Sequence, residues 1–150
     1  MEIIQTKRLT TLQFQQINQL WNDEYPVNLK DRFGILLDGA ENVHHYLIEG
    51  EHKDIVAWAV AFEKDKEVRF SIIVHPQQQG KGLGTLLINR LKEDLTDFYG
   101  WVIDHNNDKK ENGEHYKSPL AFYVKHGFEI LRDSRIDNEM LKAVKIRRRT

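Results

Sequence analysis

The chain has 150 residues, a formal net charge of −1 at pH 7 and no cysteine. One domain over residues 1–150 is expected at this length, and the near-neutral charge argues against a nucleic-acid partner, which usually demands a basic excess. The lack of cysteine excludes disulfides, thiolate metal sites and cysteine nucleophiles, and it fits a reducing, cytoplasmic environment.

The N-terminal part of the chain favours helices. A short edge strand is expected within residues 2–8, and Thr10 or Thr11 is placed to cap a helix whose apolar side chains recur with helical spacing. Residues 23–26 break that helix, and a second short helix is expected over residues 28–37. No signal peptide is visible and no apolar run reaches membrane-spanning length, so we expect no membrane partner.

Three strand-like runs follow, at residues 43–48, 55–62 and 68–74. Short charged turns join them, which is typical of antiparallel hairpins. A leucine-striped helix then begins at Leu83 and ends near Asp97. These patterns predict a meander of strands followed by a helix.

The C-terminal part continues with a short buried strand at residues 101–103, parallel to the strand before the helix because the unit is strand–helix–strand. Residues 106–117 are polar and without periodicity, so we expect a mobile loop there. In the next helix Ser118 is expected as cap, Pro119 as first residue and Gly127 as terminator.

Residues 128–131 and 140–146 supply the last strands. The whole order predicts an α/β (α+β) fold with a mixed, mostly antiparallel, splayed sheet of about six to seven strands, flanked by helices.

The most informative segment joins the strand that ends at Val74 to the leucine-striped helix. Glycines alternate there at Gly80, Gly82 and Gly84. Glycine adopts unusual dihedrals and lets another molecule approach the main chain closely. A helix N-terminus exposes unpaired N–H groups at the positive end of its dipole, so the junction is predicted to hold an anion such as a diphosphate.

Two common nucleotide loops do not fit this spacing. A dinucleotide loop has the pattern G-x-G-x-x-G near the start of repeated β-α units, whereas this loop follows a meander. A P-loop carries lysine and then serine or threonine after its last glycine, whereas Lys81 stands between glycines.

The segment QGKGLG at residues 79–84 resembles the Q/R-x-x-G-x-G/A signature of the GNAT family of acyl-CoA-dependent N-acyltransferases. The preceding V-x-P at residues 74–76 is similar to that family's strand end. A second segment, LAFYVKHGF at residues 120–128, resembles the family's later F-Y-x-K-x-G-F helix and turn. The resemblance covers residues 55–130 well and the N-terminal helices loosely.

The resemblance implies transfer of an acetyl group from acetyl-CoA to the primary amine of a small molecule or peptide, by direct attack in a ternary complex. The chain is expected to be a monomer or homodimer. Main-chain N–H groups of the glycine loop would hold the diphosphate, and the strand before it would pair with the pantetheine arm. The residues assigned to cofactor binding are Ile72, Ile73, Val74, Gln79, Gly80, Lys81, Gly82, Leu83, Gly84 and Thr85.

Tyr123 matches the family's general-acid tyrosine and would deliver a proton to the leaving thiolate. The base is not evident, because the family's glutamate is lacking on the strand before the loop; Asp104, His105, Glu24 and a water chain all remain candidates. Seven histidines occur without metal-ligand spacing, so no metal is predicted.

Two other classes of protein remain open. A non-catalytic acyl-CoA-binding regulator or sensor would keep the glycine loop without needing Tyr123, and a nucleotide-binding module would favour ATP or NAD.

In the family the N-terminal helices form one wall of the acceptor site, so Asp23, Glu24, Tyr25 and Asp31 are candidates for contact with the amine. The loop at residues 106–117 is a candidate lid over that site.

Overall fold

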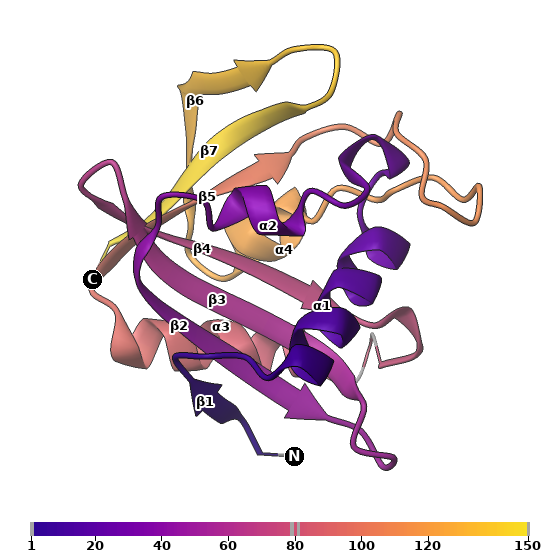
Figure 1. Cartoon of the computed structure of the whole chain (residues 1–150). Helices are drawn as coiled ribbons and strands as arrows, with labels where there is room; N and C mark the ends of the chain where they lie inside the picture. Colours follow the sequence, from indigo (N-terminus) through magenta and orange to yellow (C-terminus); the bar gives the residue numbers. More distant parts are fainter. Residues whose placement is uncertain (1, 79, 81, 150) are drawn as a thin grey trace.

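The computed structural model describes residues 2–78, 80 and 82–149 (Figure 1). In chain order its elements are β1 (Ile4–Thr6), α1 (Thr11–Glu24), the 3₁₀ helix η1 (Val27–Leu29), α2 (Phe33–Leu36), β2 (Glu41–Glu49), β3 (Ile55–Lys64), β4 (Glu67–Val74), the 3₁₀ helix η2 (Pro76–Gln78), α3 (Leu83–Asp94), β5 (Asp97–Ile103), α4 (Leu120–Lys125), β6 (Glu129–Asp137) and β7 (Lys142–Arg149).

Seven strands in the described part of the chain form one sheet in the order β1-β2-β3-β4-β5-β7-β6. Only the β4–β5 pair is parallel, and every other pair of neighbours is antiparallel. The predicted mixed, mostly antiparallel sheet with flanking helices is therefore confirmed, including the meander and the single parallel crossover.

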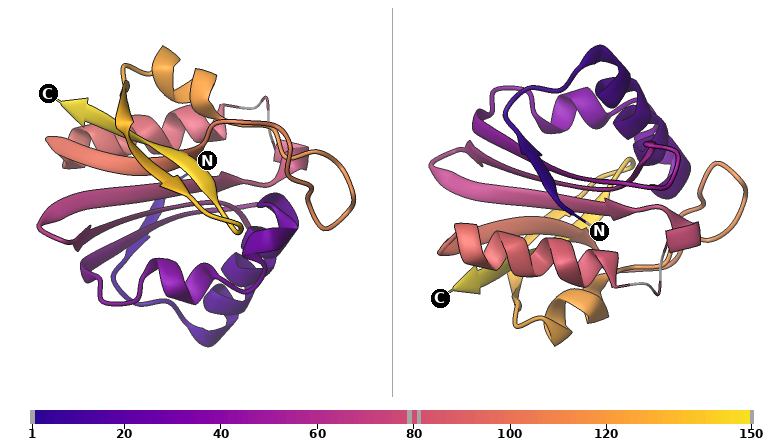
Figure 2. Two further views of the ribbon diagram at one scale, coloured as in Figure 1. Left: turned by 90° about the horizontal axis from the view of Figure 1, so that it is seen from above. Right: turned by 90° about the horizontal axis from the view of Figure 1, so that it is seen from below.

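The two faces of the sheet carry separate hydrophobic cores. Helices α1 and α2 cover one face and α3 and α4 the other (Figure 2). On β3 the side chains alternate between them: Trp58 and Phe62 belong to the core under α1, whereas Ala57 and Ala61 belong to the core under α3. The small alanines leave room for the leucines of α3, so this central strand is buried on both sides.

Helix α1 ends beside the middle of the sheet. It begins with a capping box, in which Thr10 Oγ1 accepts from the Gln13 N–H and the Gln13 side chain accepts from the Thr10 N–H. Tyr25 is its C-cap, and Pro26 follows. This end directs Tyr25 to β4, where its hydroxyl lies 3.0 Å from Ser71 Oγ.

Strands β4 and β5 diverge after a single register pair, Arg69 with Tyr99. Gly100 lies directly beyond that pair. A Cβ there would stand 2.6 Å from a ring carbon of Phe70, so glycine is required for that ring to pack against β5 at this position.

Some element boundaries differ from the sequence predictions. The helix expected over residues 28–37 is two short pieces, η1 and α2, because Asp31 between them has φ 61°, which interrupts a right-handed helix. Strand β5 begins at Asp97 rather than at residue 101, since pairing with β7 extends to Arg149. In the part of the chain that is described, no helix is long and apolar enough to cross a membrane.

Candidate active site

The glycine loop leads into α3 through left-handed backbone. Gly80 has φ 83° and Gly82, the N-cap of α3, has φ 79°. Leu83, the first helical residue, turns its side chain into the core and is 5% exposed. The first N–H groups of α3 have no carbonyl partner within the helix, so this terminus is suited to an anion.

Gly84 allows α3 to pack closely on its neighbours. A Cβ at this position would lie 3.3 Å from the Phe122 ring of α4 and 3.8 Å from Val74 of β4. Of the three glycines, Gly80 and Gly82 thus supply the backbone conformation, and Gly84 supplies the close packing of the helix on the strand.

The backbone of β4 directs polar groups into the gap beside β5. His75 donates its N–H to the Val56 carbonyl at 2.8 Å, and the β3–β4 register is continuous from that point. In an antiparallel pair, alternate residues bond to the partner strand, so Ile73 and Ser71 face β3 with their backbone groups. The N–H and C=O of Ile72 therefore point toward the gap.

A cavity of about 520 Å³, here called the glycine-loop cavity, opens between β4, α3 and α4. Of the residues predicted to bind the cofactor or act as acid, those that line it are Ile72, Ile73, Val74, Gly80, Gly82, Leu83, Gly84 and Tyr123. Thr85 is not among the described lining residues, and its hydroxyl lies 3.3 Å from His126 Nε2. Gln79 and Lys81 lie outside the described residues.

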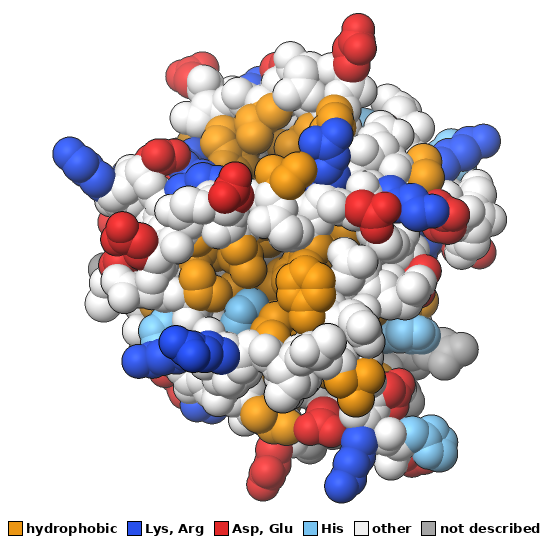
Figure 3. Space-filling view, in the orientation of Figure 1, with side chains coloured by type: hydrophobic (Ala, Val, Ile, Leu, Met, Phe, Trp, Pro, Cys, Tyr) orange, Lys and Arg blue, Asp and Glu red, His pale blue; other side chains and the backbone are white. Residues whose placement is uncertain are grey.

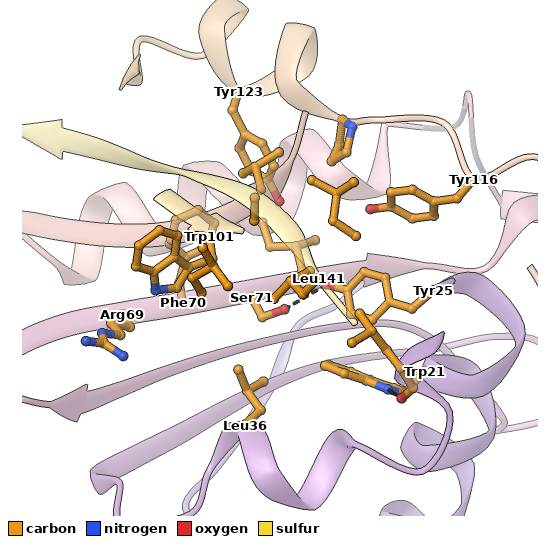
Figure 4. Close-up of a pocket in the computed structure, with 18 of the residues that line it drawn as sticks. Trp21, Tyr25, Leu36, Arg69, Phe70, Ser71, Trp101, Tyr116, Tyr123 and Leu141 are labelled. Atoms are coloured by element: carbon orange, nitrogen blue, oxygen red, sulfur yellow. Dashed lines mark hydrogen bonds between the residues drawn. The ribbon is translucent and has the colours of Figure 1, made fainter. Parts of the chain in front are cut away.

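A second cavity of about 270 Å³, the aromatic cavity, lies between the end of α1, β4 and β5. Its lining includes Trp21, Tyr25, Phe70 and Trp101 (Figure 4). On the surface, hydrophobic side chains gather in a hollow between α2 and the β6–β7 hairpin (Figure 3).

The two cavities meet in the gap between β4 and β5. The residues that line both are Tyr25, Ile72, Tyr116, Pro119 and Tyr123. A group placed beside Ile72 and Tyr123 is therefore accessible from both cavities.

Tyr123 is held at this junction by aromatic packing. It is 6% exposed, and its ring centroid lies 5.6 Å from that of Phe70 and 5.4 Å from that of Phe128. Burial, with a smaller contribution from nearby Tyr25, raises the pKa of the Tyr123 phenol above its ordinary value. The phenol is therefore protonated at neutral pH.

Tyr116 is a site residue that the sequence reasoning missed. It is 9% exposed, and its ring lies 6.0 Å from that of Tyr25. The segment at residues 106–117 is a loop, as expected, with one isolated β-bridge between Lys109 and His115, and the Lys109 carbonyl accepts from the Val27 N–H at 2.8 Å. Tyr116 is the only apolar side chain in residues 106–117, and an isolated aromatic residue in a polar loop is the sequence feature that could have identified it.

The candidate bases occupy different environments. Asp104 accepts two hydrogen bonds from Arg135, at 2.7 and 3.3 Å, which lower the pKa of its carboxyl. His105 Nδ1 accepts from the Asn107 N–H at 3.1 Å, and neither Asp104 nor His105 is among the described residues that line the two cavities.

Glu24 is the candidate base that lines a cavity, the glycine-loop cavity. Its side chain is 9% exposed and lies 3.2 Å from Lys110 Nζ. Burial raises the pKa of this carboxyl, and the ion pair with Lys110 opposes that shift. Two other acidic residues proposed for amine contact accept hydrogen bonds from neighbouring side chains. Asp23 accepts from Gln19 and Asp31 accepts from Asn22, each at 2.9 Å.

Metal ligands do not gather at this site. Over residues 2–78, 80 and 82–149, there is no group of three or more histidine and carboxylate side chains placed to hold an ion.

Comparisons with known proteins agree with this geometry. Residues 41–130 match the family described as Acetyltransferase (GNAT) domain, which is more than half of the chain. The chain belongs to the GNAT family of acetyl-CoA-dependent acetyltransferases, and the resemblance drawn from residues 79–84 and 120–128 is confirmed.

Solved structures show the same fold at low sequence identity. ElaA of Escherichia coli is 17% identical with a TM-score of 0.71, and the match covers 99% of each chain. The aminoglycoside 6'-N-acetyltransferase of Enterococcus faecium is 14% identical with a TM-score of 0.69, covering 99% of this chain and 96% of that one.

A third structure contains the acetyl donor. The phosphinothricin acetyltransferase of Sinorhizobium meliloti, in complex with AcCoA, is 16% identical with a TM-score of 0.58, covering 99% of this chain and 88% of the other. A search of curated protein sequences gives no match.

Proposed function

We propose that this chain, acting as one domain in the cytoplasm, transfers the acetyl group of acetyl-CoA to the primary amine of a small molecule or peptide. The observation that carries the proposal is the junction of the two cavities at Ile72 and Tyr123. One cavity would take the donor and the other the acceptor, so that the amine attacks the thioester directly. Such a reaction needs no covalent enzyme intermediate.

The donor would occupy the glycine-loop cavity. N–H groups from Gly80 to Thr85 would hold the diphosphate at the positive end of α3, and Gln79 and Lys81 in the same loop are proposed to assist. Support for this placement comes from the left-handed backbone of Gly80 and Gly82 and from the place of both glycines in the lining of the cavity.

The pantetheine arm would run along β4. The Ile72 N–H points into the gap beside β5 and is suited to stabilise negative charge on the thioester oxygen as the amine attacks. Ile73 and Val74 would flank the arm, because both line the same cavity.

Two side chains are proposed to move protons. Tyr123 holds its proton at neutral pH and would donate it to the departing thiolate. Glu24 is the best supported of the candidate bases, because its side chain lines the glycine-loop cavity and burial raises its pKa above the ordinary value. It would accept the amine's proton directly or through water.

The experiment has two parts. Thermal shift would compare acetyl-CoA with ATP and NAD, and acetyl-CoA alone is expected to raise Tm. A panel of primary amines would then be screened for thiol release, with the acetylated product identified by mass spectrometry. Stabilisation by ATP or NAD instead would favour a nucleotide-binding module. Stabilisation by acetyl-CoA without release above background for any amine would favour the regulator.

A further inference from the structure

The charge of the aromatic cavity restricts what it can accept. No aspartate or glutamate is among the described residues that line it. Its walls are mainly apolar, with rings from Trp21, Tyr25, Phe62, Trp101, Tyr116 and Tyr123. A buried ammonium group without a carboxylate partner is unfavourable, so a second positive charge on the acceptor has no counter-charge here.

Two cations line the same cavity, Lys64 and Arg69. Arg69 lies at one end of the cavity and Tyr116 at the other (Figure 4). Arg69 is paired with Glu67 at 2.9 Å and with Asp65 at 3.1 Å.

This end of the cavity carries an excess of positive charge. Glu67 is shared, because Lys145 Nζ lies 2.7 Å from Oε1, the same carboxylate oxygen that pairs with Arg69. Lys64 has no ion-pair partner among the described residues. Three cations therefore face two carboxylates, and neither of these carboxylates lines the cavity.

The aromatic walls compensate only partly for the lacking carboxylate. Rings attract cations over their faces, and one wall ring, that of Trp101, already has Lys145 Nζ 5.6 Å from its centroid. All of the wall rings offer apolar contact to the body of the acceptor.

We infer that the acceptor is a primary amine on an apolar, ring-sized body, with no second positive charge, and that a carboxylate at its far end is favoured. This inference rests on the proposed function. The amine would lie beside Ile72 and the far end beside Arg69. Three residues of extended strand separate these positions by about 10 Å, which an amine carried on one substituted ring can span. Polyamines and aminoglycosides are disfavoured.

The test compares amines that differ only at the far end of one ring. The matched set is phenethylamine, its para-carboxylate and its para-trimethylammonium derivative, with spermidine added as a polyamine. Thiol release gives kcat/KM for each, and mass spectrometry identifies the products. We expect the carboxylate to be the best substrate and the trimethylammonium derivative to be at least tenfold poorer than phenethylamine.

The charge at residue 64 provides the matched variant. Lys64→Glu is expected to narrow or reverse the preference for the carboxylate over the trimethylammonium derivative. Lys7→Glu makes the same charge change on an exposed residue that lines neither cavity, and it should leave the order of substrates unchanged.

The outcomes distinguish failure of this inference from failure of the proposed function. Preference for spermidine or for the trimethylammonium derivative would overturn this inference and leave the proposed function intact. Binding of acetyl-CoA, measured by calorimetry, with no amine acetylated at all would overturn the proposed function and this inference with it.

Discussion

The two cavities are made of different parts of the chain. The glycine-loop cavity combines the stretch from the end of β4 to the start of α3, which includes Ile72, Gly82 and Gly84, with residues of the end of α1, the loop after β5 and α4. The aromatic cavity is formed by side chains from α1, α2, β3, β4, β5, the β6–β7 hairpin and the loop after β5. In the proposed function the first cavity takes the donor and the second takes the acceptor. The predictions below test this division, beginning with the largest expected effect.

Tyr123→Phe acts where the two cavities meet. Loss of a general acid is expected to lower kcat by about 100- to 10,000-fold while the acetyl-CoA Kd stays nearly constant. Steady-state kinetics and calorimetry measure the two quantities. Tyr46→Phe is the matched control, since the Tyr46 hydroxyl donates to Asp94 at 3.0 Å and lines neither cavity. Unchanged turnover in Tyr123→Phe would reject the acid role.

The core on the α1 side should carry a pH dependence of stability. His45 Nδ1 accepts from Trp58 Nε1 at 3.1 Å, and burial lowers the pKa of His45 to about 4. The unfolded chain binds this proton near pH 6.5, so the stabilisation is complete above that pH and is lost as pH falls toward 4. The shift corresponds to about 3 kcal/mol of unfolding free energy.

Denaturant unfolding between pH 7 and 4 measures this dependence. His45→Gln should flatten it, whereas the same change at exposed His52 should not. Equal slopes for the wild type and His45→Gln would contradict the assignment of the buried, neutral histidine.

Gly100→Ala should disturb the aromatic cavity more than the donor side. The added Cβ would stand 2.6 Å from the Phe70 ring and displace it, at a cost of about 1–3 kcal/mol in stability. We expect a lower kcat/KM for the amine and a nearly unchanged acetyl-CoA Kd. Gly34→Ala is the control, because nothing lies within 4 Å of its Cβ position. An effect confined to acetyl-CoA binding would contradict this division of the site.

Gly82→Val should affect the donor side of the site rather than the acceptor side. A branched side chain at φ 79° strains the loop and occupies the approach to α3, so the acetyl-CoA Kd should rise about tenfold, or about 1.4 kcal/mol. Gly39→Val, at φ 73°, imposes similar backbone strain outside both cavities. If both variants weaken acetyl-CoA binding equally, the loop is not the donor site.

The parts predicted from sequence were those fixed by local patterns. The charged turns defined the meander, and the glycines of residues 80–84 with the leucine stripe defined the strand, loop and helix. Local patterns failed at residues 28–37, where a left-handed Asp31 divides the helix, and they gave no sign of the backbone bond between Val27 and Lys109 that joins the loop at residues 106–117 to η1.

The aromatic cavity was not predictable because distant residues assemble it. Tyr25 and Ser71, which are 46 positions apart, meet there. Nothing in the sequence around Trp101 or Arg69 indicates that both line one cavity. Because the residues of this cavity are far apart in the sequence, family membership identifies the acetyl donor and leaves the acceptor open.

The central claim is that donor and acceptor occupy the two cavities together and react directly. Initial rates measured over a grid of acetyl-CoA and phenethylamine concentrations test it most directly. Simultaneous binding predicts double-reciprocal lines that intersect, with no thiol release in the absence of amine. Parallel lines, with thiol released stoichiometrically before amine is added, would show a covalent acetyl-enzyme and contradict the account.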